Sequence, residues 1–133
     1  MKVMALDYGS ARTGVAVSDA TGMLPRPVGV VERAATADGL RRLAELVAEE
    51  GPERVVVGLP LTLRGEQGAQ AVETERFVEA LQLAIDVPVE RFDERFTTTL
   101  ANSGPSSRAP EDARAAAHLL EGYLAFLAAA ARE

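Results

Sequence analysis

Cysteine is absent from this chain of 133 residues, and histidine occurs only once. The lack of cysteine excludes disulfides, thiolate metal sites and a cysteine nucleophile. No apolar stretch reaches the roughly 18 residues that a membrane helix needs, because charged residues interrupt each one. The N-terminal residues also lack the layout of a secretory signal peptide. We therefore expect a soluble, cytoplasmic protein that does not act on membranes.

Basic residues are in the minority as well. The chain has 14 Lys+Arg against 20 Asp+Glu, which gives a formal net charge of −6. A protein whose main task is non-specific binding of nucleic acid usually has a basic surplus, so the charge argues against that task. It does not exclude an enzyme that handles phosphates through metal ions, because clustered carboxylates hold such ions. The length and the 47% hydrophobic content predict one globular domain over residues 1–133.

The hydrophobic pattern predicts five strands and several helices. The first three apolar runs are so closely spaced that they favour an antiparallel meander, since parallel neighbours need a longer crossover. Helices and strands alternate after them, which indicates an α/β fold with helices packed on a mixed sheet. The expected elements are strands at 2–7, 13–18, near 28–31, 54–59 and 87–92, a helix from 36 or 38 to 50, a loop at 61–68, a helix containing Val72, Phe77, Val78, Leu81 and Ile85, a short helical piece at 97–101, turns at 102–110 and a final helix from about 110.

Three acidic residues stand at the ends of predicted elements. Asp7 ends the first strand, Glu94 follows the fifth, and Asp112 lies in the first turn of the last helix. Acids at the C-terminal ends of strands commonly face the crevice where α/β sheets bind ligands. Each could equally be a cap or a solvated end. The spacing along the chain does not by itself bring the three together.

If these carboxylates share one edge of the sheet, they repel one another unless cations compensate. Hard oxygen ligands select Mg²⁺ or Mn²⁺, and two such ions can activate a water and stabilise the leaving oxygen of a phosphodiester. A histidine ligand is not expected. The single histidine, His118, lies beside the apolar stripe of the last helix and is interpreted as a partly buried helix residue.

The residues after Asp7 suggest a second possibility. Gly9, Ser10 and Arg12 can form a hairpin turn that offers backbone N–H groups to a phosphate. This is not a P-loop, which requires Gly-Lys-Ser/Thr before a helix. An ordinary hairpin turn explains the glycines equally well.

Several blocks of sequence, taken together, form a pattern that covers nearly the whole chain. They are Leu6-Asp7-Tyr8-Gly9-Ser10 with Arg12-Thr13-Gly14-Val15-Ala16 and Ser18-Asp19; Val57-Gly58-Leu59-Pro60-Leu61 with Gly65; Asp93-Glu94-Arg95-Phe96-Thr97-Thr98; and Asp112 with Ala115-Ala116 and Leu120-Glu121-Gly122-Tyr123-Leu124. In order and spacing they resemble the YqgF/RuvX family, relatives of the RuvC Holliday-junction resolvases. The resemblance implies an RNase H-like fold with a five-stranded mixed sheet flanked by helices.

The resemblance also implies a function. It places Asp7, Glu94 and Asp112 on the family's catalytic acids, which hold Mg²⁺ or Mn²⁺. Family members are widely described as maturing the 5′ end of 16S ribosomal RNA, and earlier as junction resolvases. We therefore expect a metal-dependent nuclease with nucleic acid as its partner, and pre-16S rRNA is favoured. The alternatives are a resolvase of branched DNA and a non-catalytic module that binds nucleic acid or the ribosome.

A third alternative is an ATPase of the sugar-kinase and actin-like class, which has a similar strand-acid-glycine hairpin. Those proteins clasp the nucleotide between two lobes, and 133 residues supply one.

Further candidates follow from the same motifs. Asp93 also matches, but neighbouring residues on an extended segment point to opposite faces, so we expect Glu94 alone to face the metals. Phosphate contacts are one possible role of the arginines and threonines in the list that ends this paragraph. The alternative role is a surface salt bridge for each arginine and a helix N-cap for the threonines. Residues 102–109 contain one cation where the family often has a long Lys/Arg-rich segment, which affects expected substrate affinity or preference. The candidates for phosphate contacts are Gly9, Ser10, Arg12, Arg64, Arg95, Thr97 and Thr98.

Overall fold

The computed structural model describes residues 1–21, 24–60, 68–94 and 110–131. The predicted helical piece at 97–101 and four candidate site residues, Arg64, Arg95, Thr97 and Thr98, lie outside these ranges. The elements in order are β1 (Val3–Asp7), β2 (Arg12–Ser18), β3 (Pro25–Glu32), α1 (Ala37–Glu50), β4 (Arg54–Leu59), α2 (Ala69–Ala84), β5 (Val89–Asp93) and α3 (Glu111–Ala131).

The strands form one mixed sheet in the order β3-β2-β1-β4-β5. β1 pairs antiparallel with β2 and parallel with β4, while β2 pairs antiparallel with β3 and β4 pairs parallel with β5. The predicted five-stranded sheet, antiparallel over its first three strands, is therefore confirmed. β1 is the central strand, so its C-terminal end lies in the middle of one sheet edge.

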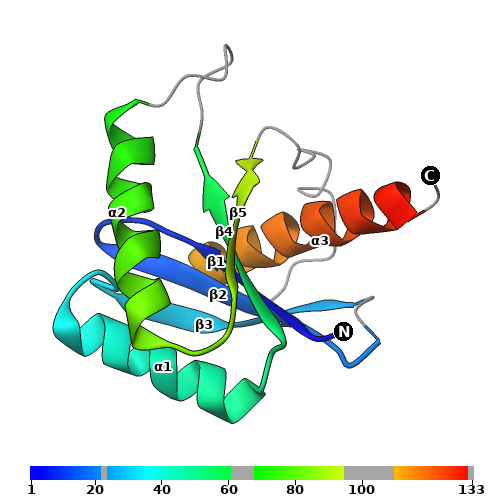
Figure 1. The fold of residues 1–133 in the computed structure, drawn as a ribbon, viewed down its shortest axis with the longest axis horizontal. Helices are drawn as coiled ribbons and strands as arrows, with labels where there is room; N and C mark the ends of the chain where they lie inside the picture. Colours follow the sequence, from blue (N-terminus) through cyan, green and yellow to red (C-terminus); the bar gives the residue numbers. More distant parts are fainter. Residues whose placement is uncertain (22–23, 61–67, 95–109, 132–133) are drawn as a thin grey trace.

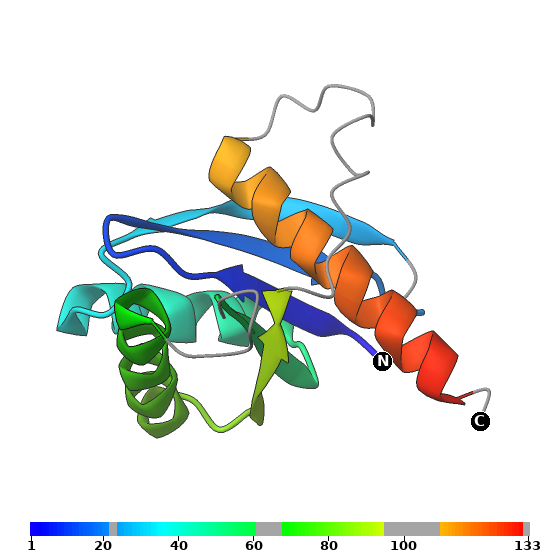
Figure 2. The same cartoon turned by 90° about the horizontal axis from the view of Figure 1, so that it is seen from above.

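Helices cover both faces of the sheet, with α3 on one face and α1 and α2 on the other (Figures 1 and 2). The side chains of β1 alternate between them. Met4 and Leu6 join the core beneath α1 and α2, whereas Val3 and Ala5 join the core beneath α3. β4 is buried on both faces in the same way, which explains its uninterrupted run of valines.

The edges of the sheet and α2 differ in detail from the prediction. β3 is longer than the expected 28–31 because it includes Pro25 and Pro27, which an edge strand tolerates. A bulge follows, where the β2–β3 register shifts between Val15 and Ala16. Val72, one of the residues that predict this helix, lies in α2 with an exposed side chain, while α2 packs through Phe77 and neighbouring residues.

A three-residue network attaches α3 to the sheet. The Arg54 guanidinium donates to the Tyr123 hydroxyl at 2.6 Å, and this hydroxyl donates to the Glu90 carboxylate at 2.7 Å. Arg54 and Glu90 also form an ion pair at 3.2 Å. The Tyr123 ring packs edge-on against Phe92. Because these contacts fix the middle of the helix on β4 and β5, they also fix where its first turn lies.

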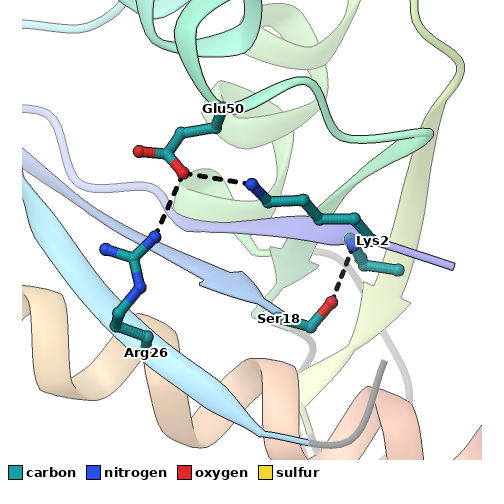
Figure 3. Close-up of polar contacts among 5 residues, drawn as sticks. Lys2, Ser18, Arg26 and Glu50 are labelled. Carbon is teal, nitrogen blue, oxygen red and sulfur yellow. Dashed lines mark hydrogen bonds and ion pairs between the residues drawn. The ribbon is translucent and has the colours of Figure 1, made fainter. Parts of the chain in front are cut away.

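Polar contacts hold the start of β1. The Glu50 carboxylate, at the end of α1, forms ion pairs with Lys2 at 3.3 Å and with Arg26 of β3 at 3.1 Å (Figure 3). The Ser18 hydroxyl accepts a hydrogen bond from the buried Val3 amide at 2.8 Å.

Within the described ranges, no helix is both long and apolar enough to span a membrane.

Candidate active site

Three strand ends meet at one edge of the sheet. β1, β4 and β5 are parallel neighbours, so their C-terminal ends lie together. The register pairs Leu6 with Val57 and Leu59 with Asp93, which places Asp7 beside Gly58 and Glu94 just beyond β5. The sheet therefore brings two of the three predicted acids to the same edge.

Gly58 makes room for the Glu94 side chain. A Cβ atom at position 58 would lie 2.6 Å from Oε1 of Glu94 and 3.0 Å from its Cγ. Because glycine has no such atom, the Glu94 side chain lies across β4. Its carboxyl group forms a hydrogen bond with that of Asp7.

Gly14 makes room for the third acid in a similar way. Gly14 is the cross-strand partner of Asp7, and a Cβ atom there would collide with the main-chain carbonyl group of Asp112. The first turn of α3 thus rests on β2, one strand away from Asp7. The Asp112 carboxylate faces Arg12, with 3.6 Å between Oδ2 and Nε. Asp112 is also close enough to Asp7 for its charge to raise the pKa of the Asp7 carboxyl.

The pKa values of the two hydrogen-bonded carboxyls favour one proton between them. Burial raises the pKa of both groups, and for Glu94 the charge of Asp7 and their hydrogen bond raise it further, to about 7. The same hydrogen bond lowers the pKa of Asp7, which is the effect expected on the accepting partner. Glu94 therefore donates and Asp7 accepts.

This proton sharing predicts an effect of pH on stability. The folded pKa of Glu94 is about 7 and its ordinary value is 4.5, so between them the folded protein binds more protons than the unfolded chain. The contribution of Glu94 is fully present below about pH 4.5 and is lost as the pH rises through 7; Asp7 acts in the same direction. Urea unfolding of the metal-free protein, measured across this range, should show a smaller loss of stability with rising pH in Glu94→Gln than in the wild type. Parallel curves would contradict the shared proton.

The structure therefore joins Asp7 and Glu94 directly and brings Asp112 to the same edge, turned toward Arg12. In the part of the chain that the structure describes, no three Asp, Glu, His or Cys side chains group closely enough to hold a metal ion. Arg12 forms an ion pair with Asp112, which was the alternative to a phosphate contact for this residue. His118 is a half-buried residue of α3, as the sequence predicts.

The predicted phosphate-binding turn lies beside a cavity. Gly9 and Ser10 line it together with Tyr8 and the first turns of α2. The Tyr8 ring stacks on Phe77 with centroids 4.4 Å apart, and its hydroxyl donates to Glu73 at 2.8 Å. Burial and the Glu73 carboxylate raise the pKa of Tyr8 to about 12.

Sequence reasoning did not identify the contacts of Tyr8 and Gly14. Tyr8 and Glu73 are 65 positions apart, and no motif contains Glu73. Gly14 does occur in the family pattern, but its partner is main chain of α3. A pattern of side-chain types gives no signal for a main-chain contact.

Solved structures with the same fold are RuvC resolvases. RuvC of Thermus thermophilus in complex with Holliday junction substrate has a TM-score of 0.69 and 19% identity, over 96% of this chain and 94% of that one. A second Thermus thermophilus RuvC structure has the same TM-score, 17% identity, and covers 98% of this chain and 97% of that one. The fold is therefore the RNase H-like fold of the RuvC type.

Sequence comparisons are more specific. The family described as "RuvX: Holliday junction resolvase" matches residues 1–125. A protein of Chloroflexus aggregans, named "Putative pre-16S rRNA nuclease", is 46% identical over 99 residues, which cover 74% of this chain and 70% of the relative. One of the same name from Chloroflexus aurantiacus is 42% identical over 130 residues, covering 92% and 85%. The chain belongs to the RuvX (YqgF) family, so the predicted resemblance is confirmed.

Proposed function

We propose that this protein is a divalent-metal-dependent nuclease that hydrolyses phosphodiester bonds during maturation of the 5′ end of 16S rRNA. The observation that carries the proposal is the hydrogen-bonded pair of Asp7 and Glu94, with Asp112 at the same sheet edge. Membership of the RuvX family and the names of the relatives support it. The enzyme acts in the cytoplasm, as one domain over residues 1–133.

The three carboxyl groups fit Mg²⁺ or Mn²⁺ by their chemistry, although in the structure Asp112 is turned toward Arg12. All three offer hard oxygen ligands, and burial and the neighbouring carboxylates raise the pKa values of Asp7 and Glu94. Asp7, Glu94 and Asp112 would hold such an ion, whose positive charge would relieve the repulsion between them. When bound by Asp7, Glu94 and Asp112, such an ion supplies Lewis-acid polarisation of the phosphate and neutralises developing charge.

The chain's own residues have separate tasks in this proposal. Asp7 is fixed by the central strand and orients the site, while Glu94 must release its proton to act as a ligand. Asp112 exchanges its ion pair with Arg12 for a place beside the other two carboxylates. Arg12, which is largely exposed, is then available to a substrate phosphate. Gly9 and Ser10 follow β1 shortly after Asp7. In this proposal they contact the substrate strand.

A substrate panel tests the proposal. The protein is incubated with Mn²⁺ and either a precursor 16S rRNA fragment or a four-way DNA junction, and the products are mapped on sequencing gels. We expect cleavage of the RNA near the mature 5′ end, its loss in Asp112→Asn, and its retention in Glu111→Gln, which changes the exposed acid next to it in the same turn. Cleavage of the junction alone would favour the resolvase alternative. Binding without cleavage would favour a non-catalytic module.

A further inference from the structure

A cavity lies beside the end of β1, on the opposite side of the strand from the carboxylates. It is lined by Tyr8, Gly9, Ser10, Ala69, Gln70 and Glu73 and has a volume of about 250 Å³. At roughly 30 Å³ per water molecule, it has room for about eight waters, which suits an organic group of the size of a sugar better than a single ion.

The lining favours a neutral, hydroxyl-bearing group of a ligand. It includes the carboxylate of Glu73 and no cation, so a sugar hydroxyl is a better occupant of the cavity than a phosphate group. Tyr8 donates to Oε2 of Glu73, which leaves Oε1 without a hydrogen bond from any residue that the structure describes. The Gln70 amide and the Ser10 hydroxyl also line the cavity, and both residues are exposed. A hydroxyl group that donates to a carboxylate makes a strong, charge-assisted bond.

Glu73 is exposed, and its hydrogen bond with Tyr8 restricts the orientation of its carboxylate. Its partner Tyr8 stacks on the buried Phe77 ring, with an angle of 19° between the rings. Glu73 itself lies on α2, which packs on the sheet through Phe77 and its neighbours. The carboxylate is therefore oriented before a ligand arrives, which reduces the entropy lost on binding.

The cavity is close to the reacting centre. Tyr8 follows Asp7 directly, and consecutive Cα atoms are only about 3.8 Å apart. The Tyr8 side chain packs on the α1/α2 side, whereas Asp7, like its cross-strand partner Gly14, faces the α3 side. A substrate strand with its scissile phosphate at Asp7 therefore reaches the cavity by passing around the end of β1.

We propose that this cavity is a ribose pocket, in which Glu73 accepts a hydrogen bond from the 2′-hydroxyl of a nucleotide next to the scissile phosphate. The 2′-hydroxyl is the group by which a protein distinguishes RNA from DNA. Glu73 is then a specificity-determining residue that makes the enzyme select RNA. This inference rests on the proposed function and deepens it by naming a residue that selects RNA over DNA.

The test is a walk of single 2′-deoxy substitutions through the three nucleotides on each side of the cleavage site of an RNA substrate. In the wild type, one position should lower kcat/KM by about 10- to 100-fold, the range for a hydrogen bond to a charged group. In Glu73→Ala, the all-ribose substrate should lose the same factor, and the deoxy substitution at that position should have no further effect. Glu79→Ala, a change on the exposed side of α2, should keep the wild-type discrimination.

The ratio of the ribose to the deoxyribose rate is a readout that a merely structural role of Glu73 would not move. Discrimination that persists in Glu73→Ala, or a wild-type enzyme that cleaves RNA and ignores every 2′-deoxy substitution, would overturn the ribose pocket and leave the proposed function intact. A wild-type protein that cleaves no RNA would instead overturn both.

Discussion

Replacing Asp7 by asparagine should lower the rate of Mn²⁺-dependent cleavage by about 10³-fold or more, while the protein stays folded. The size follows from the several kcal/mol that a metal site supplies to the transition state, at about 1.4 kcal/mol per factor of ten. Stability should stay the same or increase, because the change removes a half-buried carboxylate whose charge Glu94 and Asp112 oppose. Single-turnover rates at saturating Mn²⁺ and urea midpoints measure the two effects.

The matched control is Asp86→Asn, the same chemical change at an exposed residue between α2 and β5. It should alter neither rate nor stability. Retention of cleavage by Asp7→Asn within tenfold of the wild type, a difference of about 1.4 kcal/mol in the barrier, would remove Asp7 from the proposed site.

The second large effect is expected for Gly14→Ala. The added methyl group would collide with the main chain of Asp112 and Ala113, which no side-chain rotation relieves. Overpacking of this kind costs about 1–3 kcal/mol, and main-chain obstruction places this change at the upper end. Because α3 must shift, Asp112 is displaced and cleavage should fall as well. Chemical unfolding and cleavage rates check both parts.

Gly29→Ala is the control, since a Cβ atom there meets nothing within 4 Å. Both glycines lie in neighbouring strands, so intrinsic strand propensity changes alike. If Gly14→Ala proves as stable as Gly29→Ala, then the close approach of α3 to β2 does not hold.

Local chemistry made much of the fold predictable. The sequence predicts the start of α1 at Thr36 or Asp38, and the Thr36 side chain indeed caps the helix by accepting from the Gly39 amide. The valine run of β4 coincides with the strand. β3 was underestimated because its prolines do not form a strand pattern, and they are tolerated only because the strand lies at an edge.

The site was less accessible to sequence reasoning. The positions of Asp7, Glu94 and Asp112 at element ends could be predicted, but their convergence came only from the family resemblance. The ion pair of Arg12 with Asp112 spans 100 positions, and the Gly58–Glu94 contact depends on the register of parallel strands. Contacts of this type arise from packing, and no local pattern encodes them.

The central place of β1 has a consequence for motion. Asp7 lies in the strand paired on both sides, so its backbone opens only when the sheet itself separates, whereas Asp112 lies in a helix terminus, where fraying begins. The site thus combines a rigid half with a compliant half. Hydrogen exchange should therefore be slow for the backbone amides at the end of β1 and fast for those in the first turn of α3. Substrate release would then require movement of the first turn of α3 only.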